Sequence, residues 1–271
     1  MERHDETRFE FGANWSNFLD RSFSQERVDI SRLHLLQFVG KDSLEGMRFL
    51  DIGCGSGLHS LAALQAGAKS IISFDYDAQS VAAARQLHRL NGAPAHWQIA
   101  QGSVLDADFM AHLAPADLVY AWGVLHHTGD VWTAVRLTCD RVASGGLLYL
   151  ALYSADVQVD PPPEYWLDVK RRYVSAPWWR RRWMELAYLW RFQLHSRPWR
   201  LPALIAFSRQ YKKSRGMSFM TDVRDWLGGW PMEFCRDADV VDFVTREAGL
   251  QLIKAKTGEA NTEFLFRRAV A

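Results

Sequence analysis

Apolar and polar positions along the chain follow two different periods. Short apolar runs are separated by segments of about 10–15 residues in which apolar side chains recur every three or four positions. The runs predict buried strands, and the longer segments predict helices. Strands that alternate with helices of this length form a parallel sheet covered by helices on both faces, so the pattern predicts an α/β fold of the doubly wound, Rossmann-like kind.

The predicted elements cover most of the chain. The strands are expected at residues 47–52, 70–74, 96–100, 116–122, 147–152, 250–255 and 263–267. Between them, helices are expected at residues 58–66, 78–90, 131–142 and 237–248. The alternation divides the chain into a core of residues 41–155 and 235–271 and two further segments.

The two further segments are helical. Residues 1–40 predict an N-terminal helical cover, with a helix at 25–39. Residues 156–234 predict a helical cap that begins after Asp160 with three consecutive prolines, with helices at 165–174, 178–195 and 202–213. We expect this cap to lie over the carboxyl ends of the strands, where open α/β sheets bind their ligands.

A glycine-rich turn joins the first strand of the core to its first helix. Gly53, Gly55 and Gly57 follow the strand at alternate positions, and Asp51 lies two residues before the first of them. A strand, a tight glycine turn and a helix N-terminus together form a nucleotide-binding unit. The spacing is G-x-G-x-G, whereas a dinucleotide fingerprint requires glycine at the position of Leu58.

The run from Asp51 to Gly57, which includes Cys54, resembles the first motif of class I S-adenosylmethionine-dependent methyltransferases. The resemblance implies a mostly parallel seven-stranded sheet closed by an antiparallel hairpin, and S-adenosyl-L-methionine as the cofactor. It also implies an N-terminal segment over the cofactor, in which Trp15 is a candidate contact. The alternative of simple packing of that segment on the sheet stays open. The expected cofactor-binding residues are Asp51, Gly53, Cys54, Gly55, Gly57, Asp75, Tyr76, Ser103, Val104, Trp122 and Trp15.

The ends of the second and third strands carry chemistry that suits a nucleoside. Asp75 follows the glycine turn by about 20 residues, where an acid accepts hydrogen bonds from ribose hydroxyls. Tyr76 offers a ring for stacking on adenine. The loop with Ser103 and Val104 resembles the family's adenine-contacting loop.

The end of the fourth strand is the expected catalytic edge. Its Leu125-His126-His127 sequence resembles a loop common in small-molecule methyltransferases. Methyl transfer depends on positioning, and a base is needed only where the acceptor loses a proton. His126 or His127 can act as that base, or both can simply hold the cofactor. Glu233 is the alternative acid.

Charge and cysteine content restrict the partners. The net charge is +1, yet residues 164–215 contain 13 Lys and Arg against three acids, a local charge of +10. No apolar run is long enough to span a membrane, and the charged first residues do not resemble a signal peptide. Three widely spaced cysteines form no metal motif and favour free thiols, so we expect a cytoplasmic protein without a metal site.

The basic cap is also rich in tryptophan, which leaves several interpretations open. It can be a solvated face, or it can attract an anionic acceptor, an anionic membrane surface or nucleic acid, of which nucleic acid is the least favoured. Arg180, Trp226 and Trp230 are the candidate substrate contacts. We expect the cap aromatics to line the apolar part of the pocket.

The sequence as a whole predicts a methyltransferase that modifies a small-molecule or lipid-like acceptor, with oxygen favoured as the methylated atom. An RNA methyltransferase that uses the basic cap is the first alternative. A catalytically silent, cofactor-binding partner subunit is the second. The sequence does not indicate the oligomeric state.

Overall fold

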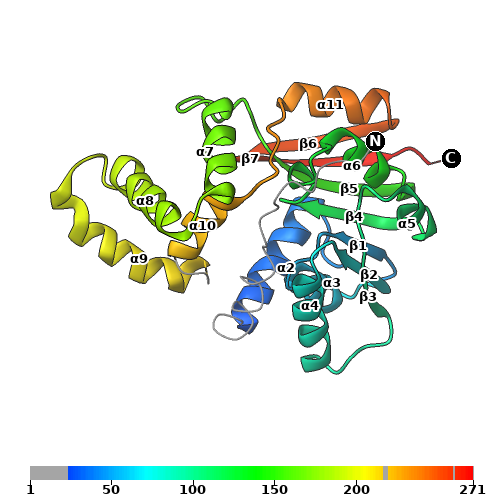
Figure 1. The fold of residues 1–271 in the computed structure, drawn as a ribbon. Helices are drawn as coiled ribbons and strands as arrows, with labels where there is room; N and C mark the ends of the chain where they lie inside the picture. Colours follow the sequence, from blue (N-terminus) through cyan, green and yellow to red (C-terminus); the bar gives the residue numbers. More distant parts are fainter. Residues whose placement is uncertain (1–23, 216–218, 259, 271) are drawn as a thin grey trace.

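The computed structural model describes residues 24–215, 219–258 and 260–270, and its ribbon is drawn in Figure 1. These residues form one seven-stranded sheet in the order β3-β2-β1-β4-β5-β7-β6. Neighbouring strands pair in parallel except at β7, which is antiparallel to both β5 and β6. The predicted fold class, including the closing hairpin, is confirmed.

The strands are β1 (Arg48–Ile52), β2 (Ser70–Asp75), β3 (Trp97–Gln101), β4 (Ala116–Trp122), β5 (Val142–Tyr153), β6 (Leu250–Thr257) and β7 (Asn261–Arg268). The helices around the sheet are α2 (Gln25–Val39), α3 (Leu58–Gln65), α4 (Ala78–Leu90), α5 (Ala107–His112), η1 (Leu125–His127), α6 (Val131–Cys139) and α11 (Asp237–Arg246). The segment between β5 and α11 contains α7 (Pro163–Ser175), α8 (Trp178–Tyr188), η2 (Leu189–Gln193), η3 (Pro198–Arg200), α9 (Leu201–Arg215) and α10 (Phe219–Gly228).

Each face of the sheet has its own hydrophobic core. Phe49 of β1 packs in the cluster formed with α2, α3 and α4, whereas Leu50 and Ile52 pack in the cluster formed with α5, α6 and α11. All three side chains are 1% exposed. Burial of each such side chain stabilises the fold by about 1.5–3 kcal/mol. An apolar run buried on both faces therefore makes β1 a central strand.

Several predicted boundaries are wrong by a few residues. The strand expected at 147–152 is the longer β5, which begins at Val142, so the preceding helix ends at Cys139. A positive φ at Gly145 occurs within β5, and a Cβ at Gly146 would lie 2.8 Å from the Ala143 carbonyl oxygen. The glycine pair therefore lets an irregular strand continue where its composition predicts a break. The short helix α5 was not predicted at all.

The inserted segment begins and ends at one place on the core. Ser154, just after β5, forms a parallel bridge with Cys235, and the Ala155 amide donates to the Cys235 carbonyl oxygen at 2.8 Å. Between these points α7 to α10 form a separate lobe beside the sheet (Figure 1). The lobe has its own small core, in which Trp166, Tyr173 and Leu227 are buried.

A buried carboxylate joins three helices of the lobe. Glu185 of α8 is 4% exposed and accepts a hydrogen bond from the Tyr173 hydroxyl of α7 at 2.9 Å. Arg182 of α8 and Arg224 of α10 also donate to the Glu185 carboxylate, at 2.8 and 3.3 Å. A buried charge with several donors holds its surroundings in one arrangement, because losing a donor leaves the charge uncompensated.

Two helix boundaries in the lobe differ from the prediction. The helix expected at 178–195 ends as α8 at Tyr188 and continues as a π-helical turn, η2. Asp225 and Trp226, expected in a glycine-bearing loop, belong to the last turn of α10. Asp225 and Trp226 continue the helical backbone of α10, and Gly228 and Gly229 end the helix.

Helix α2 packs against α3 on one face of the sheet. Its Phe38 is 6% exposed and stacks on Tyr149 of β5 with ring centroids 4.2 Å apart. The rest of the predicted N-terminal cover, residues 1–23, lies outside the described residues, so the proposed contact of Trp15 with the cofactor stays a prediction. In the described part of the chain, no helix combines the length and apolar character needed to cross a membrane.

The docking of α2 is open to a direct test. We expect Phe38→Ala to lower the free energy of unfolding by about 3–5 kcal/mol, because it leaves a cavity beside Tyr149. Leu33→Ala on the same helix is the control, since Leu33 is 51% exposed and should change stability by less than about 0.5 kcal/mol. Denaturant unfolding of both variants measures the difference, and equal losses would contradict the docking of α2.

Candidate active site

The glycine turn is held to the neighbouring strand by its backbone. The amides of Gly53 and Cys54 donate to the Phe74 carbonyl oxygen of β2 at 2.8 and 3.0 Å. Gly53 has a φ of +69°, and a Cβ there would lie 2.4 Å from the Val124 side chain. The turn therefore fits only glycine at this position, and it lies at the carboxyl ends of β1, β2 and β4.

Asp75 connects the end of β2 to the turn. Its Oδ2 atom accepts a hydrogen bond from the Gly55 amide at 2.9 Å, and its Oδ1 atom accepts one from the Asp77 amide at 2.9 Å. Burial raises the pKa of this carboxyl group, and the two amides lower it. Each carboxylate oxygen has a further lone pair, so Asp75 keeps the capacity to accept hydroxyl groups of a ligand.

Asp51 lies in the interior, between β1 and α3. It is 2% exposed and accepts a hydrogen bond from the Ser60 hydroxyl of α3. Ser60 and Ser73 lie 2.7 Å apart, and the Trp97 indole donates to the Ser73 hydroxyl at 2.8 Å. Burial raises the pKa of Asp51 to about 7. Asp51 thus belongs to a buried polar network behind the turn, and its direct contact with a cofactor stays a prediction.

The other predicted cofactor residues differ in exposure. Tyr76 is 60% exposed beside Asp75, so its ring is accessible to a ligand. Cys54 and Val104 are buried, and Ser103 accepts a hydrogen bond from the Leu105 amide at 3.2 Å. Trp122 is 39% exposed, and its indole donates to Glu263 at 2.8 Å. The accessible aromatic rings therefore lie at the ends of β2 and β4.

The two predicted histidines make different contacts. His126 is fully buried, and its Nδ1 atom accepts a hydrogen bond from the Tyr153 amide at 3.4 Å. Its Nε2 atom is buried without a hydrogen-bond partner among the described residues. The His127 Nδ1 atom lies 2.9 Å from the Pro231 carbonyl oxygen and therefore donates to it. Burial lowers the pKa of His127 to about 4 and that of His126 well below its usual range, so both rings are neutral at pH 7.

Two side chains that the sequence analysis missed lie at this site. The Tyr153 ring, at the end of β5, lies 4.4 Å from the His126 ring. Lys170 of α7 is 1% exposed, and its ammonium group donates to the Trp226 carbonyl oxygen and lies 4.1 Å from the Trp226 ring centroid. Burial lowers the pKa of Lys170 to about 7, and its charge contributes to the low pKa of both histidines.

The segment from α10 to α11 covers the histidines. The Glu233 amide donates to the His126 carbonyl oxygen at 2.9 Å, and one Glu233 carboxylate oxygen accepts from the Val131 amide at 2.9 Å. Burial raises the pKa of Glu233. Its observed contact is with the N-terminus of α6, which is a positioning role, whereas the predicted catalytic role stays a prediction.

The predicted substrate residues are not all brought together. Trp226 lies between Tyr153 and Trp166, at ring distances of 5.7 and 5.0 Å. Trp230 lies under the Arg171 guanidinium at 5.0 Å. Arg180 is exposed on α8, which lies on the side of the lobe away from the sheet (Figure 1). Trp226 and Trp230 therefore lie near the histidines, whereas Arg180 belongs to α8, a helix that lies beyond α7 as seen from the sheet (Figure 1).

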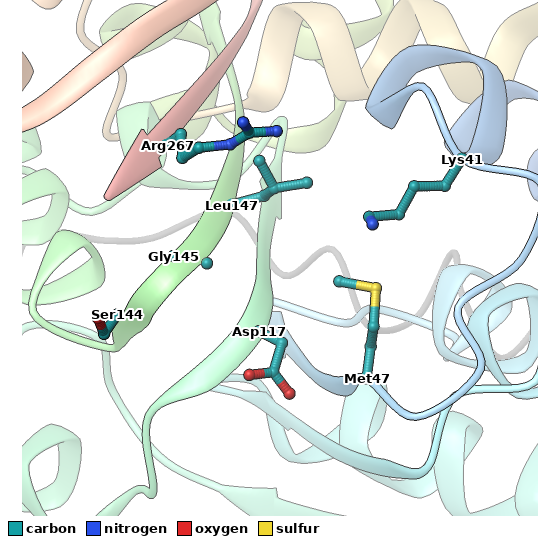
Figure 2. Close-up of a pocket in the computed structure, with 8 residues that line it drawn as sticks. Lys41, Met47, Asp117, Ser144, Gly145, Leu147 and Arg267 are labelled. Atoms are coloured by element: carbon teal, nitrogen blue, oxygen red, sulfur yellow. The ribbon is translucent and has the colours of Figure 1, made fainter. Parts of the chain in front are cut away.

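A separate hollow lies at the opposite edge of the sheet. Figure 2 shows Lys41, Met47, Asp117 and Arg267 around it, near the amino ends of the parallel strands. Asp117 there forms an ion pair with Arg48 at 2.8 Å. No residue of the glycine turn or of the histidine loop lines this hollow, so it is not part of the candidate active site.

Comparison with known proteins identifies the family. A methyltransferase domain matches residues 23–212, which is more than half of the chain. The chain belongs to this methyltransferase family. The match confirms the predicted S-adenosylmethionine-dependent methyltransferase and its cofactor, whereas the Leu-His-His subgroup stays a prediction.

Similar proteins carry several names. The ribosomal protein L11 methyltransferase of Pseudomonas putida strain W619 is 33% identical over 141 residues, which cover 46% of this chain and 44% of that protein. The ubiquinone biosynthesis O-methyltransferase of Rhizobium rhizogenes is 30% identical over 135 residues, covering 48% and 52%. The chain thus spans about half the length of the curated relatives it matches.

Solved structures share the fold. An O-methyltransferase family protein from Burkholderia thailandensis aligns over 96% of this chain and 59% of its own, with a TM-score of 0.58 and 15% identity. Magnesium protoporphyrin IX methyltransferase from Synechocystis PCC 6803, solved with bound SAM, aligns over 99% and 100%, with a TM-score of 0.56 and 13% identity. At this identity the similarity shows the methyltransferase fold alone.

The residues of this methyltransferase fit its cofactor. The Gly53 position leaves no room for a Cβ, Asp75 retains acceptor capacity, and Tyr76 exposes a ring beside it. These are the chemical groups that a nucleoside with ribose hydroxyls requires. Asp75, Tyr76 and the turn would hold the nucleoside, and the predicted cofactor contact of Trp122 stays a prediction.

The buried network around Asp51 predicts a pH dependence. The folded chain keeps a proton on Asp51 that the unfolded chain releases, because its pKa rises from 3.8 to about 7 on folding. The free energy of unfolding contributed by this group therefore falls as the pH rises from about 4 to 7. We expect the difference in unfolding free energy between Asp51→Asn and the parent to be more favourable to the variant at pH 8 than at pH 5.

The matched control is Asp108→Asn, a change of an exposed acid on α5. Thermal unfolding at both pH values measures the effect, and a parent-like pH profile of Asp51→Asn would contradict the raised pKa. Calorimetric titration with S-adenosylmethionine then tests the predicted contact, since an unchanged affinity removes Asp51 from the cofactor-binding residues.

Proposed function

We propose that this methyltransferase modifies an oxygen atom of a small-molecule or lipid-like acceptor bound between the histidine loop and the inserted lobe. The observation that carries the proposal is a chain of contacts: the Lys170 ammonium group lies over the Trp226 ring, Trp226 contacts the Tyr153 ring, and Tyr153 contacts the His126 ring. Aromatic rings with a few polar atoms are typical of a small-molecule site.

The surroundings of the histidines favour an acceptor with an apolar body. Tyr153 makes ring contacts with Trp226 and Phe234, and Trp226 continues the aromatic contacts to Trp166. Contiguous aromatic rings of this kind bind the apolar body of a ligand by packing and stacking.

The chain's own residues supply the polar chemistry. When bound, S-adenosylmethionine supplies an activated methyl group. Because the His126 Nδ1 atom accepts from the Tyr153 amide, its Nε2 atom carries the proton in the neutral ring and donates to an acceptor oxygen. Lys170, with a pKa of about 7, takes the hydroxyl proton in its neutral form. His127, held by Pro231, positions the loop.

Two other functions remain alternatives with distinct signatures. An RNA methyltransferase would use the positive charge of residues 164–215, and one relative is named for a tRNA modification, tRNA U34 carboxymethyltransferase of Methylococcus capsulatus. A silent partner subunit would bind the cofactor without turnover. The His126 Nε2 atom is buried and has no hydrogen-bond partner within the described part of the chain. This favours the small-molecule enzyme, since a buried polar atom without a ligand is costly.

The function is tested by the fate of a labelled methyl group. The purified chain is incubated with methyl-labelled S-adenosylmethionine and a cell extract, and the products are divided into organic-soluble, RNA and protein fractions. We expect the label in organic-soluble products. Methyl esters among them release methanol on alkaline hydrolysis, whereas methyl ethers resist it. Label in RNA or in protein would contradict the proposed acceptor class, and no incorporation by a chain that binds the cofactor would favour the silent subunit.

Lys170 offers a sharper test of the proton transfer. With the acceptor in hand, we expect Lys170→Met to lower kcat by about 10²–10⁴ and leave cofactor affinity unchanged. In the parent, kcat should rise as the pH passes about 7, where Lys170 loses its proton, and this rise should vanish in the variant. Lys256→Met, at an exposed position on β6, is the control.

Turnover of Lys170→Met equal to that of the parent would show that catalysis depends on positioning alone. A companion variant, His126→Ala, separates proton transfer by Lys170 from binding of the acceptor oxygen by His126. It should raise the KM for the acceptor and retain the pH-dependent rise, because Lys170 is still present. Thermal unfolding of each variant confirms that the fold persists.

A further inference from the structure

The outer side of α8 and of the π-helical turn η2 that continues it exposes a stripe of large apolar side chains. Trp179, Trp183, Leu186 and Trp190 follow one another at steps of four, three and four residues. Residues at this spacing share one face of a helix. Their exposed fractions are 54, 68, 55 and 46%. The prediction that the cap tryptophans line the substrate pocket is therefore wrong for Trp179, Trp183 and Trp190, and of the six tryptophans in residues 164–215 only Trp166 is buried.

The inward side of α8 explains why the stripe faces solvent. Glu185 is buried by Tyr173 and Arg224, and Arg181 donates to the carbonyl oxygens of Val174 and Ala176 at 2.6 and 2.9 Å. These contacts hold one side of the helix against α7 and α10. By its spacing along the helix, the apolar stripe then lies on the opposite side of α8 from Arg181 and Glu185.

The charge around the stripe has one sign. Residues 178–200 contain six arginines and a single acid, Glu185, which is the buried one. Arg180 flanks the stripe, and Arg197 and Arg200 are exposed in the turn that follows, next to Trp199, which is 73% exposed. The outward surface of this segment thus presents tryptophan and arginine without any carboxylate.

We propose that this surface, Trp179, Trp183, Leu186 and Trp190 with Arg180, Arg197 and Arg200, docks the protein on an anionic lipid bilayer. Tryptophan is enriched at the boundary between lipid headgroups and acyl chains, where its ring is buried and its N–H stays hydrated. Arginines beside it bind anionic headgroups, so the charge complements the bilayer surface. The helix lies on the membrane and does not cross it.

The proposal is independent of the acceptor, because the surface lies outside the active site. An RNA strand would also attract the arginines, but it gains nothing from the exposed Leu186. A second copy of the chain would bring the same positive charges together, which opposes association through this face. An anionic bilayer satisfies both the apolar stripe and the charge.

Co-sedimentation with vesicles tests the docking. We expect the parent to bind phosphatidylcholine vesicles that contain phosphatidylglycerol, to bind phosphatidylcholine alone much less, and to be released as salt is raised. The charge variant, Arg180→Gln with Arg197→Gln and Arg200→Gln, should lower the partition coefficient more than tenfold, at roughly fivefold per arginine. Arg181 and Arg182 are left intact, because they hold the lobe together.

The apolar variant, Trp183→Ser with Trp190→Ser, should lower binding on the same vesicles and reduce quenching of tryptophan emission by brominated lipid. The control variant, Arg89→Gln with Leu90→Ser, removes an exposed arginine and an exposed leucine from α4 and should bind like the parent. Unfolding temperatures of all variants should match that of the parent.

Three results would overturn the proposal. One is a parent that does not bind anionic vesicles at low salt, and another is a charge or apolar variant that binds as tightly as the parent. The third is a parent that forms dimers which either variant dissociates, since this assigns the surface to a second copy. A parent that binds vesicles but does not bind S-adenosylmethionine would contradict the proposed function and leave the membrane docking supported.

Discussion

The hydrogen bonds between the end of β2 and the glycine turn are the constraint on which this structure depends. The Phe74 carbonyl oxygen and the Asp75 carboxylate together receive the amides of Gly53, Cys54 and Gly55. These contacts fix the path of the chain from β1 into α3. They also leave Asp75 and the exposed Tyr76 at the surface where a nucleoside fits, so the fold and the cofactor site share one set of interactions.

The inserted lobe is the part of the chain to which the proposed function assigns the acceptor. Its chain leaves and rejoins the core at the Ser154–Cys235 bridge, so a whole set of helices is attached without disturbing the sheet. One side of the lobe brings Lys170 and Trp226 to the histidine loop. The other side exposes the α8 stripe. A single insertion can therefore both close an acceptor site and carry a surface for the membrane.

Burial is the physical origin of the unusual titration behaviour at the site. At pH 7 His126 and His127 are neutral, and Lys170, with a pKa of about 7, is only partly protonated, because burial disfavours the charged form of each side chain. A mixture of neutral donors and acceptors suits proton transfer from a weakly acidic hydroxyl. The same burial makes the site dependent on the lobe, since an open site would return the lysine to its usual pKa.

The sequence by itself determined the doubly wound sheet, the cofactor turn and the loop with the two histidines, because each depends on a local pattern: apolar runs, alternate glycines and short motifs. Only the tertiary structure decided that Lys170 is buried. The sequence of its helix is largely polar, and the burial depends on packing against Trp226, which is distant in sequence. The same holds for the cap tryptophans. The sequence shows that the cap is rich in tryptophan, but whether Trp179 and Trp183 face inward depends on which side of α8 the buried Glu185 holds against α7 and α10.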